Sequence, residues 1–180
     1  VEILIKLLFR LDYIYTYSLS LKISCKYPTI IDLVIESSSK NKNIYLNEFE
    51  KFVNAIDYKT VSNKYKYNIL VGNVYNSFFH MYKAYQYYVE AWKEYNDIEL
   101  AKKILDTIIR MKSLNIVVEY KNTFSLIYSY LKANGKFSEI ETALIGSYYH
   151  FQNEEYNDGV ILFNEQLLSL NFDTLEKDQI

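Results

Sequence analysis

The residues that could carry out catalysis or bind metal are few and far apart in the sequence. His80 and His150 stand about 70 residues from each other, and neither belongs to an H-E-x-x-H motif or a His/Cys cluster. Cys25 has no nucleophile motif around it, and a buried apolar thiol is the commoner state of such a residue. We therefore expect no catalytic residue, no metal site and no cofactor, and we interpret the chain as non-enzymatic.

Acidic residues gather near residue 156, where we expect a helix to begin. Glu154, Glu155 and Asp158 resemble a carboxylate cluster, but no Gly-centred calcium loop surrounds them. Acids are favoured at a helix start because of the helix dipole alone. We interpret the cluster as a solvated helix terminus.

The composition favours helices and argues against several function classes. The chain has 180 residues, of which 50% are hydrophobic, so it can form a real core. Four isolated glycines and one proline leave too few turn residues for hairpins or a phosphate loop. The net charge is −2 and only two of the 20 basic residues are arginine, so we expect no direct nucleic-acid contact.

Two further features of the sequence indicate the cellular compartment of the protein. The single cysteine excludes an intramolecular disulfide framework and fits a reducing, cytoplasmic location. The most apolar stretch, Val1 to Leu11, is interrupted by Glu2, Lys6 and Arg10, so it is too polar for a membrane span or a signal-peptide core. A chain that begins at valine suggests that something upstream is missing.

Helix signals recur along the chain. The clearest predicted helix runs from Asn96 to Met111, with apolar residues on one stripe and Asn96 and Glu99 as a capping box. The same capping pattern stands at Asn47 with Glu50 and at Ser138 with Glu141. Further helices are expected at Asn115 to Lys132, with Gly135 as the left-handed cap, and at Tyr156 to Leu170.

One stretch has a competing interpretation. Between Leu11 and Cys25 the odd positions are apolar or aromatic and the even ones mostly polar, which is typical of a half-buried strand. A strand of 15 residues is long, because about 5–6 is usual, and no partner strand is evident. We predict a helix from Asp12 to Tyr27.

An internal repeat supports that choice. Val71-Gly72-Asn73-Val74-Tyr75 has the apolar, small, x, x, aromatic form of a first helix, and Ala84, Tyr88 and Ala91 follow at second-helix spacing. Small residues at Gly72, Ala84 and Ala91 let two antiparallel helices approach closely, while Tyr75 and Tyr88 fill the remaining room. This pattern resembles a tetratricopeptide repeat over about 34 residues, Tyr65 to Ile98.

The resemblance extends in phase with gaps. A next unit covers Glu99 to Lys132, and a last unit covers roughly Ile140 to Asp173. The single proline, Pro28, lies two periods before Asn96, where the repeat commonly ends its second helix, and this favours a helix over Asp12 to Tyr27. Residues Ile31 to Lys64 match poorly and are expected to hold two shorter helices around the polar loop Ser37 to Asn43.

The resemblance implies an all-α fold, a right-handed superhelix of about five antiparallel helix pairs. It is expected to form one domain over residues 1–173, with the first unit incomplete, followed by a tail at 174–180.

Similar degenerate arrays occur in the regulatory domains of Rgg- and PlcR-type Gram-positive regulators that sense peptides. That likeness implies quorum sensing, a DNA-binding part upstream of this chain, and dimerisation through the array. The alternative is a generic scaffold that docks a folded protein partner.

The twenty tyrosines admit two interpretations. Tyr85, Tyr87, Tyr88 and Tyr95 with Trp92 form either an aromatic surface that anchors a ligand or part of the core between repeats. Tyr88 matches a packing position of the repeat and is expected in the core, whereas Tyr85 and Trp92 stay open.

In a tetratricopeptide-like array, the first helices line a concave face suited to an extended peptide. Asparagine amides can donate to and accept from a peptide backbone, and lysine or arginine can hold a carboxylate. A solvated helix face would show the same residues. The peptide-binding residues predicted on this face are Lys66, Asn73, Asn76, Lys103, Thr107 and Arg110.

Overall fold

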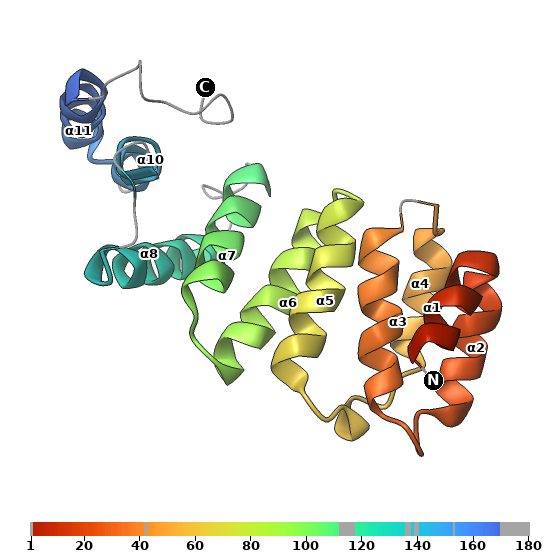
Figure 1. Ribbon diagram of the computed structural model, residues 1–180. Coiled ribbons are helices and arrows are strands. Elements are labelled where there is room, and N and C mark those ends of the chain that lie inside the picture. Colours follow the sequence, from red (N-terminus) through yellow and green to blue (C-terminus); the bar gives the residue numbers. More distant parts are fainter. Residues whose placement is uncertain are drawn as a thin grey trace. The chain divides into compact units, whose positions relative to one another are not determined.

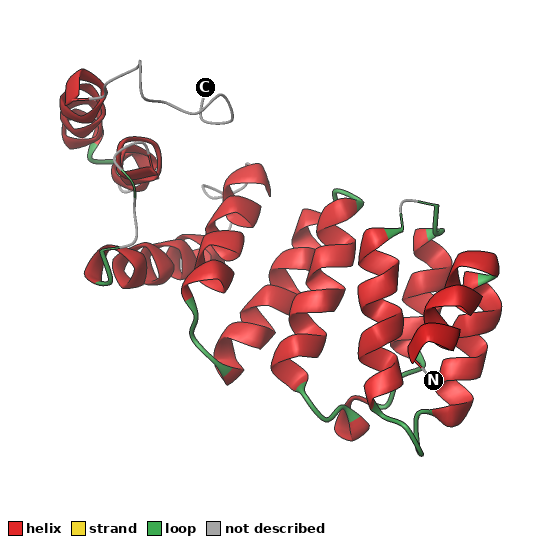
Figure 2. Cartoon of the chain, viewed as in Figure 1, coloured by secondary structure: helices red, strands yellow, loops and turns green. Residues whose placement is uncertain are grey.

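The computed structural model describes residues 2–41, 43–111, 118–135, 138, 141–152 and 154–169, which form helices joined by loops and turns (Figures 1 and 2). No strand occurs in these ranges, so the prediction of an all-α fold is confirmed. The elements are α1 (Glu2–Leu11), α2 (Tyr13–Ile23), α3 (Thr29–Lys40), α4 (Leu46–Asn54), a 3-10 turn η1 (Tyr58–Thr60), α5 (Lys64–Ser77), α6 (Met81–Glu94), α7 (Ile98–Met111), α8 (Val118–Ala133), a π-helical turn η2 (Thr142–Gly146), α10 (Ser147–Gln152) and α11 (Tyr156–Ser169).

The chain divides into two compact units, Val1–Lys103 and Ile104–Ile180. A helical array produces such units because each hairpin contacts only its neighbours. The predictions of a single domain over residues 1–173 and of a superhelix of five helix pairs therefore stay predictions. The predicted tail, 174–180, lies outside the described residues.

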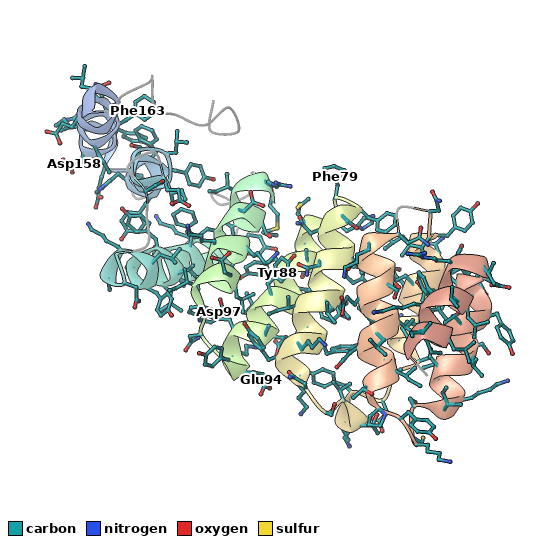
Figure 3. The ribbon with its side chains drawn as sticks, viewed as in Figure 1. Phe79, Tyr88, Glu94, Asp97, Asp158 and Phe163 are labelled. Carbon is teal, nitrogen blue, oxygen red and sulfur yellow. The ribbon has the colours of Figure 1, made fainter. Side chains whose placement is uncertain are left out.

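Helices α5 and α6 pack closely against each other in unit 1. A Cβ placed on Gly72 would lie 2.5 Å from Cε1 of Tyr88, so only glycine allows the two helices this approach. Tyr88, labelled in Figure 3, is fully buried, and so are Ala84 and Ala91. The packing roles predicted for these small residues and for Tyr88 are confirmed.

Aromatic rings fill the space between the other helices of unit 1. Tyr17 of α2 stacks on Phe52 of α4 with ring centroids 4.5 Å apart, and its hydroxyl lies 3.0 Å from Oγ of Ser38. Phe49 of α4 meets the edge of Tyr75 of α5 at 5.8 Å. Tyr17 and Tyr75, each only 4% exposed, are therefore core residues rather than parts of a recognition surface.

The aromatic group around α6 divides in the same way. Tyr85 is buried like Tyr88, Tyr87 and Trp92 are half-buried, and Tyr95 is exposed. The open question over Tyr85 is thus resolved in favour of the core.

Residues 13–23 form a helix despite their alternating pattern. The buried side chains of α2 are Thr16, Tyr17 and Ser20, which share one helical face. The two hydroxyls can be buried because they donate to backbone carbonyls of the helix itself, Thr16 to Asp12 and Ser20 to Tyr17. The helix is shorter than predicted, and Pro28 precedes α3 instead of closing α2.

Several predicted helix ends need correction. Asp97 caps α7 in place of Asn96, since its Oδ1 accepts from the backbone N–H of Glu99 and of Leu100. Asn96 instead donates to the Trp92 carbonyl. Asn47 lies inside α4, which begins at Leu46, so it caps nothing.

Two other predicted ends are confirmed. Ser138 and Glu141 form a reciprocal capping box, each side chain accepting from the other residue's backbone N–H. Gly135 follows α8 with φ +59°, the left-handed cap that its position predicted.

In unit 2, glycines again set the distance between helices. A Cβ on Gly159 of α11 would lie 2.6 Å from the Phe151 ring of α10, and one on Gly146 would lie 2.8 Å from Leu162. Tyr128 of α8 stacks on Tyr149 of α10 at 4.5 Å. The helix predicted from Tyr156 is confirmed as α11.

Candidate functional site

Three helices of unit 1 lie side by side along one face. Helix α3 packs against α1 on one side and against α5 on the other (Figure 1). These are the first helices of the first three predicted pairs, whereas α2, α4 and α6 are the second helices. The face that a tetratricopeptide-like array would use for a ligand is therefore built here from α1, α3 and α5.

A cavity of about 540 Å³ opens between α1 and α3. Such a volume lies within the range of about 300–1,000 Å³ that is usual for small-ligand sites. Its lining is strongly polar. The lining residues are Lys6 and Arg10 of α1, Glu36, Ser37 and Lys40 of α3, and Asn41 and Asn43 of the following loop.

The cavity lining has a positive net charge, although the net charge of the whole chain is negative. Three cationic side chains and one carboxylate give the described residues of the lining a net charge of +2, against −2 for the whole chain. Lys6 and Arg10 share one face of α1 because they are four residues apart. An excess of cations concentrated in this way attracts a negatively charged group.

Glu36 is the one acid among these cations. Its carboxylate accepts a hydrogen bond from Nζ of Lys40 at 2.6 Å, and this bond lowers the pKa of Glu36. Burial opposes the shift, while the charges of Lys40, Lys66 and Lys6 assist it. Glu36 is therefore ionised at neutral pH and restrains Lys40 at the cavity wall.

A second acid lies near the start of the same helix. Asp32 is only 8% exposed, and burial raises the pKa of its carboxyl, with the Lys66 charge opposing the rise. Lys66, one of the predicted binding residues, is exposed on α5 and acts on both Asp32 and Glu36. It thus belongs to the charged face formed by α1, α3 and α5.

Two of the predicted binding residues are engaged with each other. Oδ1 of Asn73 accepts from the Tyr88 hydroxyl at 2.9 Å and from Nζ of Lys103 at 3.2 Å. The Lys103 ammonium also lies 6.0 Å from the centre of the Tyr88 ring. Asn73 and Lys103 therefore help to hold unit 1 together.

The other three predicted binding residues, Asn76, Thr107 and Arg110, differ in how far their side chains reach solvent. Oδ1 of Asn76 is buried, and no donor in the described part of the chain reaches it. Thr107 is 1% exposed, so its side chain does not reach solvent. Arg110 is half-exposed, and its Nε donates to Asp106 at 3.0 Å.

The residues that line the cavity were not predicted as binding residues. Lys6 and Arg10 were treated only as interruptions of an apolar stretch, and the loop after α3 as a polar break. A usable signal was present, because Lys40 follows Lys6, and Lys66 follows Asp32, by one 34-residue period. Such a step places both members of a pair at equivalent positions of neighbouring first helices.

Another polar cluster lies in unit 2. Nδ1 of His150 is 2.7 Å from a carboxylate oxygen of Glu155, and Asp158 lies close enough that all three ligand atoms are within 4.8 Å of one another. Glu155 and Asp158 stand at the start of α11, where the dipole favours acids (Asp158 is labelled in Figure 3). An ion pair and a helix terminus account for this cluster.

The remaining chemically active residues stand apart from these clusters. Cys25 is exposed, which corrects the expectation of a buried thiol. His80 is exposed at the start of α6. Within the described residues, no helix has both the length and the apolarity needed to cross a membrane.

Comparison of the chain with protein-family models, with curated proteins and with solved structures gave no match. The resemblance to tetratricopeptide repeats, and to Rgg- and PlcR-type regulators, therefore remains a prediction from the sequence.

Proposed function

We propose that unit 1 is a non-enzymatic binding domain that takes a short extended peptide on the face formed by α1, α3 and α5. The cavity of about 540 Å³ between α1 and α3 carries this proposal, since cationic and amide side chains converge on it from two neighbouring helices. Such groups recognise a peptide backbone and its negative charges.

We propose further that this chain is the sensor part of a peptide-responsive transcription regulator in the cytoplasm. It then works with a DNA-binding part outside this sequence and as a homodimer. The sequence resemblance supports this further proposal, whereas the cavity supports peptide binding only.

Native mass spectrometry of the protein purified from its own host tests the proposal. Bound peptides are released by denaturation and sequenced. We expect one short peptide per chain, and we expect Lys6→Gln to reduce its occupancy. Lys22→Gln is the matched control, because Lys22 is also an exposed lysine near a helix end, on α2, and lies outside the cavity lining. Protein that never carries a peptide overturns the proposal.

A second candidate function is docking of a folded protein partner. It is favoured by apolar side chains exposed on α1 and at the start of α2, among which Leu11 is 84% exposed. Residues Leu4, Leu7 and Leu11 of α1 repeat at spacings of three and four, as in a helix that packs on another helix. Under this alternative, Leu7→Glu with Leu11→Glu removes the bound partner, whereas Lys6→Gln does not.

A further inference from the structure

We infer that the cavity between α1 and α3 holds a single carboxylate of the bound peptide. This inference rests on the proposed function and names the group that the site recognises. Lys6, Arg10 and Lys40 supply the positive charge, while Asn41 and Asn43 supply side-chain amide donors at the same wall.

The position of the cavity on the helices sets how much charge it can accept. Arg10 lies in the last turn of α1 and Lys40 in the last turn of α3, so both helix C-termini border the cavity. Each C-terminus carries roughly half a negative charge. The net charge of +2 from the side chains is thereby reduced to about +1.

A site of about +1 matches one carboxylate better than a doubly charged phosphate. Glu36 strengthens this preference, because it is ionised and lies among the cations. A phosphate would place two negative charges close to that carboxylate, and like charges at short range are unfavourable. A neutral group would gain no attraction from the positive charge of the lining.

Arginine and lysine divide the task in this arrangement. The guanidinium of Arg10 has a planar fork of donors that fits the two oxygens of a carboxylate. Lys6 stands one turn earlier on the same face and adds a second cation. Lys40 is held by Glu36 at 2.6 Å and fixes the opposite wall. The volume leaves room for the peptide end that carries the carboxylate.

The carboxylate can come from the C-terminus of the peptide or from an Asp or Glu side chain. The probes are therefore four mixtures of random hexapeptides composed otherwise of uncharged residues. The first has a free C-terminus, the second is amidated, the third is amidated with one Asp, and the fourth is amidated with one phosphoserine. Each mixture is incubated with the full 180-residue chain, and retained peptides are quantified by mass spectrometry.

We expect retention of the first or the third mixture to exceed that of the amidated mixture about tenfold, the size of one charge-assisted contact. Retention of the first assigns the carboxylate to the C-terminus, and retention of the third to a side chain. Arg10→Gln should abolish the excess, whereas Lys22→Gln should preserve it. Circular dichroism of both variants controls for folding, since Arg10 and Lys22 are exposed.

Other outcomes are decisive as well. Equal retention of all four mixtures, unaffected by Arg10→Gln, overturns the carboxylate inference and leaves peptide binding intact. Preferential retention of the phosphoserine mixture also overturns it, because it means that the site accepts more negative charge than we infer. Retention of no mixture, together with the absence of a co-purified peptide, overturns the proposed function itself.

Discussion

Gly72→Ala tests the close packing of α5 on α6 directly. The added Cβ would lie 2.5 Å from Cε1 and 2.7 Å from Cδ1 of Tyr88. The Tyr88 ring cannot swing away freely, because it is fully buried and its hydroxyl is bonded to Asn73. Either the ring or the helix axis has to shift.

Two opposing contributions decide the sign of the change in stability. Alanine is the better helix former by about 1 kcal/mol, which favours the variant. Overpacking a filled core costs about 1–3 kcal/mol, which opposes it. Because the contact involves ring atoms of a buried side chain, we expect the cost to exceed the gain by about 1–2 kcal/mol. For a chain of this size that lowers the thermal midpoint by about 3–6 °C.

The assay is thermal unfolding followed by circular dichroism at 222 nm, repeated with urea. Tyr88→Leu is combined with Gly72→Ala in a double-mutant cycle, since the smaller side chain should relieve the clash. Ser77→Ala serves as the control on the same helix: Ser77 is exposed at its end, and the change removes the bond from its Oγ to the Val74 carbonyl without adding a Cβ against a buried ring. A Gly72→Ala variant that is more stable than the parent chain would refute the close approach of the two helices.

Three further outcomes are expected. Gly135→Ala should destabilise unit 2 by about 1 kcal/mol, because φ is +59° and no neighbouring atom lies near the new Cβ, so backbone strain acts alone; the thermal midpoint reports it. Ser138→Ala should cost about 1 kcal/mol by removing one half of the capping box with Glu141, and a loss in Ser138→Ala/Glu141→Ala that differs from the sum of the two single losses would show their cooperation. Asp32→Asn should stabilise unit 1 at pH 7, since burial raises the pKa of the Asp32 carboxyl and the folded state binds its proton more tightly than the unfolded state does. The stability that protonated Asp32 contributes is present at low pH and is lost as pH rises through the raised pKa. The gain in unfolding free energy from Asp32→Asn, measured with urea, should therefore become smaller when the pH is lowered from 7 to 4. A gain that stays constant with pH would contradict this reasoning.

The helical nature of the chain could be predicted because local signals agreed with one another. Gly72, Ala84 and Tyr88 stand at spacings that only a close helix pair explains, and the structure packs them together. Gly135 and Ser138 are similarly local, since a cap depends on a few neighbouring residues. Signals of this kind need no knowledge of the tertiary structure.

Predictions that depended on one residue of register were less secure. Asn96 and Asp97 are both good capping residues, and sequence alone does not choose between adjacent candidates. The helix began after Asp97, which leaves Asn96 to bond the end of α6. The alternation at residues 11–25 is typical of a strand although the stretch is the helix that we predicted, because buried serine and threonine look polar in a pattern while their hydroxyls bond to their own helix.

The location of the cavity could not be found by reading each helix separately. Its walls come from α1 and α3, and the cationic character arises only when Lys6, Arg10 and Lys40 face one another. The repeat period links Lys6 to Lys40, but this link has meaning only if the first pair belongs to the array. The sequence showed that first pair only as an incomplete unit.

The contrast between Asn73 and Lys6 indicates where a ligand can bind without disturbing the fold. Asn73 uses its carbonyl oxygen for both Tyr88 and Lys103, so a ligand that took this oxygen would break two contacts of the α5 and α6 region. Lys6 and Arg10 are exposed on α1, and a ligand carboxylate there adds a partner for charges that the fold brings together. A ligand bound at α1 and α3 would therefore stabilise unit 1, whereas one bound through Asn73 would have to offset a loss of packing, and this difference favours the cavity over Asn73 as the place of binding.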